Sequence, residues 1–171
     1  MSDATGIAMQ DDPTQRIKES AMKLATLLWL TQLLPQPYAD QACLATTVYL
    51  EARNQSELGQ RAVAEVALRR LDSGHWGDTL CEVVTAPRQF APTLVSPDYE
   101  LQNARAWNHA VAIALRVQRD WNQPVAQRRF VVPGADHFLA QAKVRNTPDW
   151  AQGVPIATIG DHTFYRVSRR L

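Results

Sequence analysis

The chain has 171 residues, of which 46% are hydrophobic, and its formal net charge is +1. This length suits one domain with its own apolar core. The near-neutral charge excludes the polybasic character of a nucleic-acid-binding protein. The sequence has no nucleotide-binding glycine loop, no CxxC pair and no cysteine–histidine cluster with zinc spacing, so we expect neither a metal nor a cofactor.

The N-terminal segment reads as a polar tail followed by an apolar helix. Residues 16–35 carry a leucine-rich stripe after basic positions, and three interpretations are open: a helix docked on the domain, an export signal or a membrane span. The apolar run is short for a span, and we expect membrane contact only through this segment. The chain is therefore divided into residues 1–39 and a main domain over residues 40–171.

The next two predicted elements are helices joined by a polar break. Asp40 is a candidate N-cap for the first helix, which carries Cys43 through Glu51. Ser56 can cap a second helix from Glu57 to about Leu71. Its apolar stripe contains Leu58, Ala62, Val63, Val66, Ala67 and Leu71.

The remaining elements are shorter, and the sheet is expected late in the chain. Ser96 as cap and Pro97 at the first helical position predict the start of a helix. Gly160-Asp161 between two β-rich runs suits a hairpin turn. The order suggests an α+β fold whose small antiparallel sheet forms largely from the C-terminal part. In chain order, we expect a helix or strand over 79–84, an irregular loop over 86–92, a helix from Ser96 to about Arg119, a strand over 130–132 and a hairpin over 155–167.

Glu51 is the candidate catalytic residue. It lies three residues after Val48, on or beside the buried face of its helix, where a carboxylate is out of place unless it is paired or used. The mouth of a helix–turn–helix can desolvate a carboxylate, raise its pKa and still admit substrate. The alternative is an ordinary glutamate that is solvated or paired with Arg53.

One carboxylate is enough for one kind of glycosidic cleavage. The acid delivers a proton to the leaving oxygen, and in a lytic transglycosylase the sugar's own 6-hydroxyl replaces the activated water. Gln89, Phe90, His137 and Tyr165 are candidates for lining such a groove. Most tryptophans should pack in the core, leaving one or two for a sugar-binding groove, among Trp76, Trp107, Trp121 and Trp150.

Two other classes of function stay open. Cys43 with His137 or His162 would make a cysteine hydrolase, although Cys43 has no flanking cation or helix N-terminus to activate its thiol. Cys43 and Cys81 are equally well explained as one disulfide or as two buried thiols. A non-catalytic wall-binding or virion structural module is the other class, which the aromatic content permits without arguing for it.

Five short motifs follow one another between Gln41 and Val167. They are Tyr49–Arg53 (YLEAR), Gly59–Val66 (GQRAVAEV), Arg88–Ala91 (RQFA), Ala135–Phe138 (ADHF) with Pro148–Trp150 (PDW), and Ile159–Tyr165 (IGDHTFY). In this order they resemble the SleB/CwlJ family of bacterial cell-wall hydrolases. Members of that family act in spore cortex lysis, in Gram-negative envelopes and in phage lysis.

The resemblance implies a compact, lysozyme-like α+β fold and no metal. It implies cleavage of peptidoglycan glycan strands between N-acetylmuramic acid and N-acetylglucosamine, with Glu51 of the E-A-R motif as the acid. A lytic transglycosylase is the first expectation, and a muramidase-type hydrolase with water as acceptor is the alternative. The protein would be a monomer that acts in the cell wall or periplasm, either exported or released as a phage lysis enzyme. The implied substrate-binding residues are Gln89, Phe90, His137, Phe138 and Tyr165.

Three positions depart from the family pattern. Asn54 stands where the family usually has glycine, Arg69 where it has asparagine, and Asp136 where it has threonine. These changes bear on substrate preference more than on the acid. Asp136 is best explained as a turn residue, and the alternative is a second carboxylate near Glu51 that would favour hydrolysis.

Overall fold

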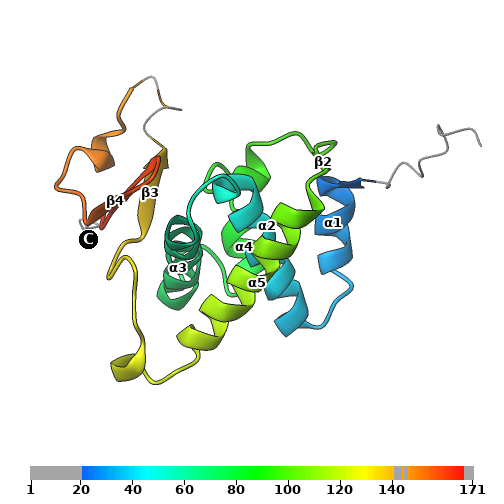
Figure 1. The fold of residues 1–171 in the computed structure, drawn as a ribbon, viewed down its shortest axis with the longest axis horizontal. Helices are drawn as coiled ribbons and strands as arrows, with labels where there is room; N and C mark the ends of the chain where they lie inside the picture. Colours follow the sequence, from blue (N-terminus) through cyan, green and yellow to red (C-terminus); the bar gives the residue numbers. More distant parts are fainter. Residues whose placement is uncertain (1–20, 141–143, 145, 168–171) are drawn as a thin grey trace, which may run out of the picture.

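The computed structural model describes residues 21–140, 144 and 146–167. In this part of the chain, helices lie between a two-stranded ribbon at one end and a three-stranded sheet at the other (Figure 1). The predicted α+β class is therefore confirmed. The main helices are α1 (Leu24–Thr31), α2 (Gln36–Ala52), α3 (Glu57–Ser73), α4 (Leu80–Thr85) and α5 (Ala104–Trp121), with short 3-10 turns η1 (Ala91–Thr93), η2 (Val125–Gln127) and η4 (Asp149–Ala151).

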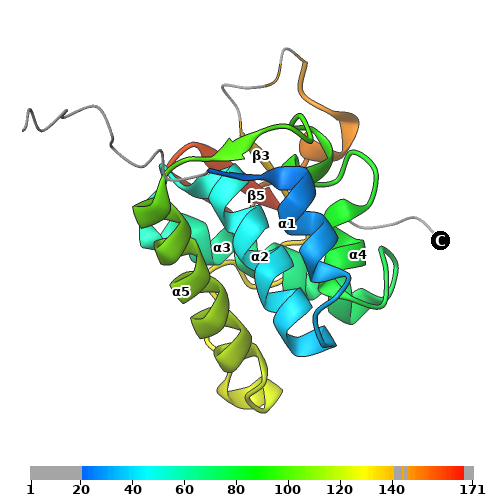
Figure 2. The ribbon, with the colours of Figure 1, turned by 90° about the vertical axis from the view of Figure 1, so that its right-hand side faces the viewer.

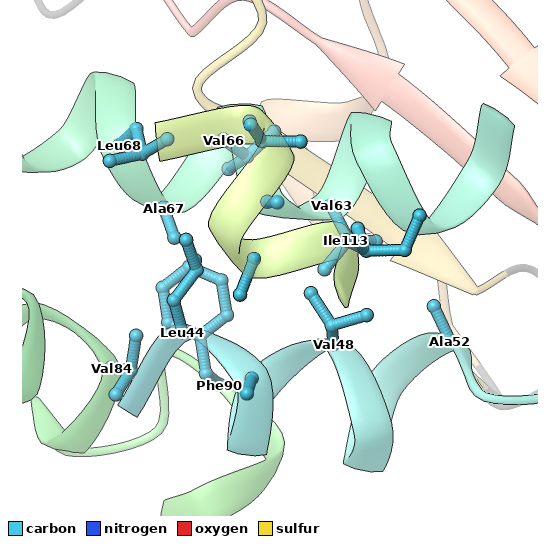
Figure 3. Close-up of a cluster of buried hydrophobic side chains, with 14 of the residues drawn as sticks. Leu44, Val48, Ala52, Val63, Val66, Ala67, Leu68, Val84, Phe90 and Ile113 are labelled. Carbon is cyan, nitrogen blue, oxygen red and sulfur yellow. The ribbon is translucent and has the colours of Figure 1, made fainter. Parts of the chain in front are cut away.

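Helix α2 is the centre of the core, and α5 runs alongside it (Figure 2). Leu44, Val48 and Ala52 repeat every four residues on one face of α2 and are fully buried. In Figure 3, Val48 points toward Ile113 of α5 and Val63 of α3, and Leu44 points toward Ala67 of α3. Since full burial of a leucine or valine side chain contributes about 1.5–3 kcal/mol, this packing fixes the end of α2, where Glu51 lies.

Helix α3 confirms the second predicted helix. The Ser56 hydroxyl accepts a hydrogen bond from the Gly59 N–H at 3.3 Å, so Ser56 is the N-cap. The helix ends at Gly74, whose φ of 64° is in the left-handed region. Leu58 departs from the predicted apolar stripe because its side chain is exposed.

The segment after α3 is a helix, and it is cross-linked to α2. Thr79 and Glu82 form a capping box at the start of α4. Cys43 of α2 and Cys81 of α4 form a disulfide. The structure thus selects the disulfide over two buried thiols, and it removes Cys43 as a cysteine nucleophile because the sulfur is already bonded.

The C-terminal sheet has strand order β3-β5-β4, and all its pairs are antiparallel. The predicted hairpin is present, with the turn at Gly160-Asp161 and a φ of 57° at Gly160. Phe138 and Phe164 lie opposite each other, and this face packs on the helical core. The strands are β3 (His137–Ala140), β4 (Ala157–Ile159) and β5 (His162–Tyr165).

The helix expected from Ser96 begins later, at Ala104, with Asn103 as its N-cap. The Ser96 hydroxyl accepts the Asp98 N–H, which forms a local turn instead of a helix start. Strand β2 (Glu100–Leu101) then pairs with β1 (Met22–Lys23). The prediction was wrong because a strand partner far away in the sequence takes this backbone out of the helical conformation.

The strand expected over residues 130–132 is also absent. The N–H groups of Val131 and Val132 donate to the Glu65 carboxylate of α3, at 2.7 and 3.0 Å. A side chain therefore takes the place of a neighbouring strand as the hydrogen-bond partner.

Helix α1 is shorter than the predicted apolar helix and packs on the domain. Residues 16–20 of the expected segment lie outside the described residues. Leu24 and Leu27 are buried, and the Leu24 N–H donates to the Tyr99 carbonyl at 2.8 Å. No described helix combines the length and the apolar character needed to cross a membrane.

Asp40 is not a helix cap, because α2 already begins at Gln36, directly after Pro35. The Asp40 carboxylate instead accepts the Leu80 N–H at 2.9 Å, which joins the first half of α2 to the start of α4. The expected boundary between residues 39 and 40 thus falls inside α2.

Candidate active site

Glu51 lies in the last turn of α2 and is half-buried. Its Oε1 accepts a hydrogen bond from the Ala91 N–H, with a nitrogen–oxygen distance of 2.6 Å. A hydrogen bond of this length fixes one carboxyl oxygen and so orients the other. Ala91 begins η1, directly after Gln89 and Phe90, so this loop reaches Glu51 through its backbone.

Arg70 of α3 connects this loop to the sheet. Its side chain is buried, with an exposed fraction of 3%. Nη1 donates to Gln89 Oε1 at 3.1 Å, and Nε donates to the Asp136 carbonyl at 2.7 Å. The guanidinium also lies over the rings of Trp76 and Phe90, with Cζ 4.9 and 4.7 Å from their centroids. The buried guanidinium of Arg70 therefore binds both Gln89 and the backbone just before β3.

Phe90 is a core residue and not an exposed groove residue. Its ring is fully buried, and its centroid lies 6.0 Å from that of Phe138. The Phe90 side chain has no exposed surface with which to touch a ligand, so its role as a substrate contact stays a prediction from the motif. The buried Phe90 ring instead anchors the loop. The N–H of the following residue, Ala91, contacts Glu51.

His137 and Tyr165 lie on the opposite face of the sheet from Phe138. They are direct partners in the β3–β5 register, so their side chains share a face. The His137 ring is 6.0 Å from the Trp76 ring and 5.0 Å from the Trp150 ring, measured between centroids. Tyr165 is buried against Trp150. His137, which is half-buried, is thus the more accessible member of the pair.

Asp136 directly precedes β3 and lies outside regular secondary structure, two residues after the turn at residues 133–134. Its Oδ1 lies 2.8 Å from His137 Nδ1 and accepts the Val167 N–H at 2.9 Å. These contacts orient the His137 ring and tie the end of the sheet.

Arg53 flanks the same end of α2 and is exposed. Its Cζ lies 5.1 Å from the ring centroid of Tyr49 and 5.8 Å from that of Tyr99. The sequence left open a Glu51–Arg53 ion pair. Instead, the guanidinium stacks on the two tyrosines, and no ion pair of Arg53 is found among the described side chains.

Sequence reasoning missed Arg70 and the Ala91 N–H as parts of the site. A signal for Arg70 was present, since it lies four residues after Val66 and seven after Val63, on the buried face of its helix. A cation on an apolar face is as unusual as the carboxylate at Glu51. The Ala91 contact had no signal, because every residue type except proline supplies a backbone N–H.

The described residues around Glu51 hold no metal cluster. Within the described ranges, no group of three or more histidine, cysteine, aspartate or glutamate side chains is placed to hold a metal ion. A hollow of about 1170 Å³ lies between the β1–β2 ribbon, α1 and Trp107 of α5, and Glu51 does not line it. Glu51 is half-buried at the end of α2.

A family model described as Cell Wall Hydrolase matches residues 54–165. The chain belongs to the cell wall hydrolase family. This membership confirms the family resemblance of the motifs. The matched region begins three residues after Glu51, so the role of Glu51 stays a prediction that depends on its motif and its geometry.

Two known proteins are similar to this chain. A spore cortex-lytic enzyme of Oceanobacillus iheyensis is 44% identical over 59 residues, which are 33% of this chain and 21% of that protein. The matched segment thus spans about a fifth of this curated relative. The catalytic domain of the germination-specific lytic transglycosylase SleB from Bacillus anthracis has a TM-score of 0.55 and 27% identity, covering 77% of this chain and 98% of that one. The fold of this cell wall hydrolase is therefore similar to that of the SleB catalytic domain.

Proposed function

We propose that this protein cleaves the glycan strands of peptidoglycan as a lytic transglycosylase, with Glu51 as its single catalytic residue. One observation carries the assignment: a half-buried carboxylate at the end of α2, with one oxygen held by the Ala91 N–H at 2.6 Å. Family membership and the similarity to the SleB catalytic domain support it.

The reaction needs one proton carrier. The Glu51 carboxyl donates its proton to the oxygen between N-acetylmuramic acid and N-acetylglucosamine as the glycosidic bond breaks. The 6-hydroxyl of the muramic acid then attacks its own anomeric carbon, and the hydroxyl proton passes to the Glu51 carboxylate. The product ends in 1,6-anhydro-muramic acid, no water is consumed, and Glu51 returns to its protonated form.

We propose fewer residues as substrate contacts than the motifs suggested. Gln89 and His137 are half-buried and present polar atoms, so they are the proposed contacts with the glycan. Phe90 and Phe138 support this surface from below through their ring contact. Tyr165 positions Trp150 beside His137.

The disulfide supports a location for this activity. Cys43–Cys81 is the kind of bond that persists in oxidising compartments. We therefore propose that the protein acts in the cell wall or periplasm, where peptidoglycan is found, after export or release during phage lysis.

The decisive experiment is mass spectrometry of the products from purified peptidoglycan, with wild type and Glu51→Gln in parallel. We expect 1,6-anhydro-muramic acid ends from the wild type and none from Glu51→Gln, because the amide cannot carry the proton. Glu57→Gln, an exposed change at the start of α3, is the matched control and should behave as wild type.

The other outcomes each point elsewhere. Reducing-end products would make water the acceptor, and the search for its base would begin at Asp136. Wild-type cleavage by a folded Glu51→Gln variant would show that the catalytic residue is wrongly assigned. If no protein releases soluble products, a non-catalytic wall-binding module becomes the better description.

A further inference from the structure

Arg53 is an exposed cation at the C-terminal end of α2, two residues beyond Glu51. Its guanidinium lies over the rings of Tyr49 and Tyr99, and no ion pair neutralises it among the side chains that the structure describes. Stacking on two rings and a side-chain hydrogen bond to Tyr99 restrict the guanidinium, which has further N–H donors at the edge of its plane.

The two tyrosines form a rigid platform. Tyr49 is buried, its hydroxyl accepts the Asn103 N–H at 3.3 Å, and its ring meets Trp107 edge-on at 6.0 Å. The Tyr99 carbonyl accepts the Leu24 N–H. Burial raises the pKa of Tyr99 against the opposing effect of the Arg53 charge, so the Tyr99 hydroxyl stays neutral at neutral pH. The cation is therefore held in place before any ligand arrives, which reduces the entropy lost on binding.

Arg53 and Glu51 are placed to contact different parts of one ligand. Residues two apart on a helix do not face each other, so the two side chains diverge from the same helix end. A polymer that crosses this end can meet Glu51 with its cleaved bond and Arg53 with a neighbouring group. A guanidinium recognises carboxylates through paired N–H donors, and peptidoglycan carries its carboxylates in the peptide stem of muramic acid, or on the lactyl group where the stem is missing.

We propose that Arg53 is a carboxylate-binding subsite for the acidic substituent of muramic acid. The inference rests on the proposed glycan cleavage and adds a substrate preference to it: strands with ionised carboxylates should bind better than strands with neutral ones.

The test compares native peptidoglycan with the same material after its carboxylates are capped with carbodiimide and glycinamide. For the wild type, capping should raise the half-saturating substrate concentration about tenfold and leave the maximal rate nearly unchanged. Arg53→Gln should show this loss already on native material and no further loss on capped material. Arg53→Lys, which keeps the charge without the fork, should be intermediate.

Arg105→Gln is the control variant, because Arg105 is an exposed arginine on α5 that should respond to capping as wild type does. Equal wild-type activity on both substrates, or an unchanged capping effect in Arg53→Gln, would overturn the proposal. The comparison of native and capped peptidoglycan with the wild-type protein uses no variant. Its result therefore tests the proposal even if a thermal unfolding assay shows that Arg53→Gln is less stable.

A third substrate identifies the source of the carboxylate. Amidase treatment removes the stem carboxylates and frees the lactyl carboxylate, which the stem otherwise holds as an amide. Arg53-dependent binding to stemmed strands alone would assign the subsite to the stem, and Arg53-dependent binding to both materials would show that it also accepts the lactyl carboxylate. If wild type releases no glycan products, or Glu51→Gln remains active, the proposed function fails. If Glu51→Gln is inactive but capping has no effect, only the Arg53 subsite fails.

Discussion

Arg70 lies on the buried face of α3 and joins three parts of the proposed site: the loop before η1, the segment before β3 and the ring of Trp76. The loop in turn supplies the N–H that holds Glu51. A buried arginine of this kind is kept by its hydrogen bonds, because an uncompensated buried charge is costly.

We expect Arg70→Lys to lower the free energy of unfolding by about 1–3 kcal/mol and to reduce glycan cleavage. Lysine keeps the charge but cannot reach both Gln89 and the Asp136 carbonyl from one planar group. Chemical denaturation and product release would be measured together. Arg105→Lys, on the exposed face of α5, is the control. Unchanged stability and rate in Arg70→Lys would show that Arg70 does not hold the loop.

For the predicted site residues, sequence patterns predicted the position along a helix or loop but not which side chains are buried. Helical spacing placed Glu51 beside the buried face near a helix end, and it is half-buried there. The Gln-Phe motif lies directly before Ala91, whose N–H contacts Glu51, and the Phe90 ring is fully buried. A motif gives the residues of a loop, whereas which of them turn inward depends on the packing around that loop.

At the scale of elements, Glu65 decides the structure of the segment after α5. Its buried carboxylate accepts the N–H groups of Val131 and Val132, so this apolar segment needs no strand partner. Burial raises the pKa of Glu65, while the two N–H donors and nearby arginines oppose the shift. The folded protein therefore binds the Glu65 proton at higher pH than the unfolded chain does.

The sign of the pH dependence follows from this shift. The contribution of Glu65 to stability is greatest below its ordinary value of 4.5 and falls as pH rises through the raised folded pKa. Glu65→Gln should lack this dependence. It should also be about 1–3 kcal/mol less stable in acid, since its amide nitrogen would face a backbone donor.

Denaturation of wild type and Glu65→Gln at a series of pH values above 4 would measure both effects. Glu57→Gln, an exposed change on the same helix, is the control and should keep the wild-type slope. A wild-type slope in Glu65→Gln would assign the pH dependence to another group.

The start of α5 is a second case in which a local sequence pattern did not predict the structure. Serine followed by proline is a good helix start, and the chain nevertheless places β2 between Ser96 and the start of α5. The partner strand β1 lies almost eighty residues earlier. Local propensity is a weak preference, and a distant backbone partner overrides it.

At the scale of the whole molecule, the disulfide closes a 38-residue separation between α2 and α4. The Cys43→Ala/Cys81→Ala double variant should lose about 4 kcal/mol of stability in the chain-entropy model, which lowers the melting temperature by about 10 °C. Its cleavage rate well below that temperature should match wild type, because neither sulfur takes part in the reaction. Calorimetry and product release test both, and loss of activity with an intact fold would return a chemical role to Cys43.

The sequence by itself determined the helix that carries Glu51, the cap and extent of α3, the C-terminal hairpin and the family motifs. Each of these depends on spacing within one segment, where side-chain periodicity and turn chemistry act over a few residues. Only the tertiary structure decided that Cys43 and Cys81 are bonded, that Phe90 is buried and that Arg70 bridges the site. It also decided that Arg53 stacks on Tyr49 and Tyr99 instead of pairing with Glu51. These contacts join segments that lie apart in the sequence, and their energies depend on which partners the folded core brings within a few ångströms.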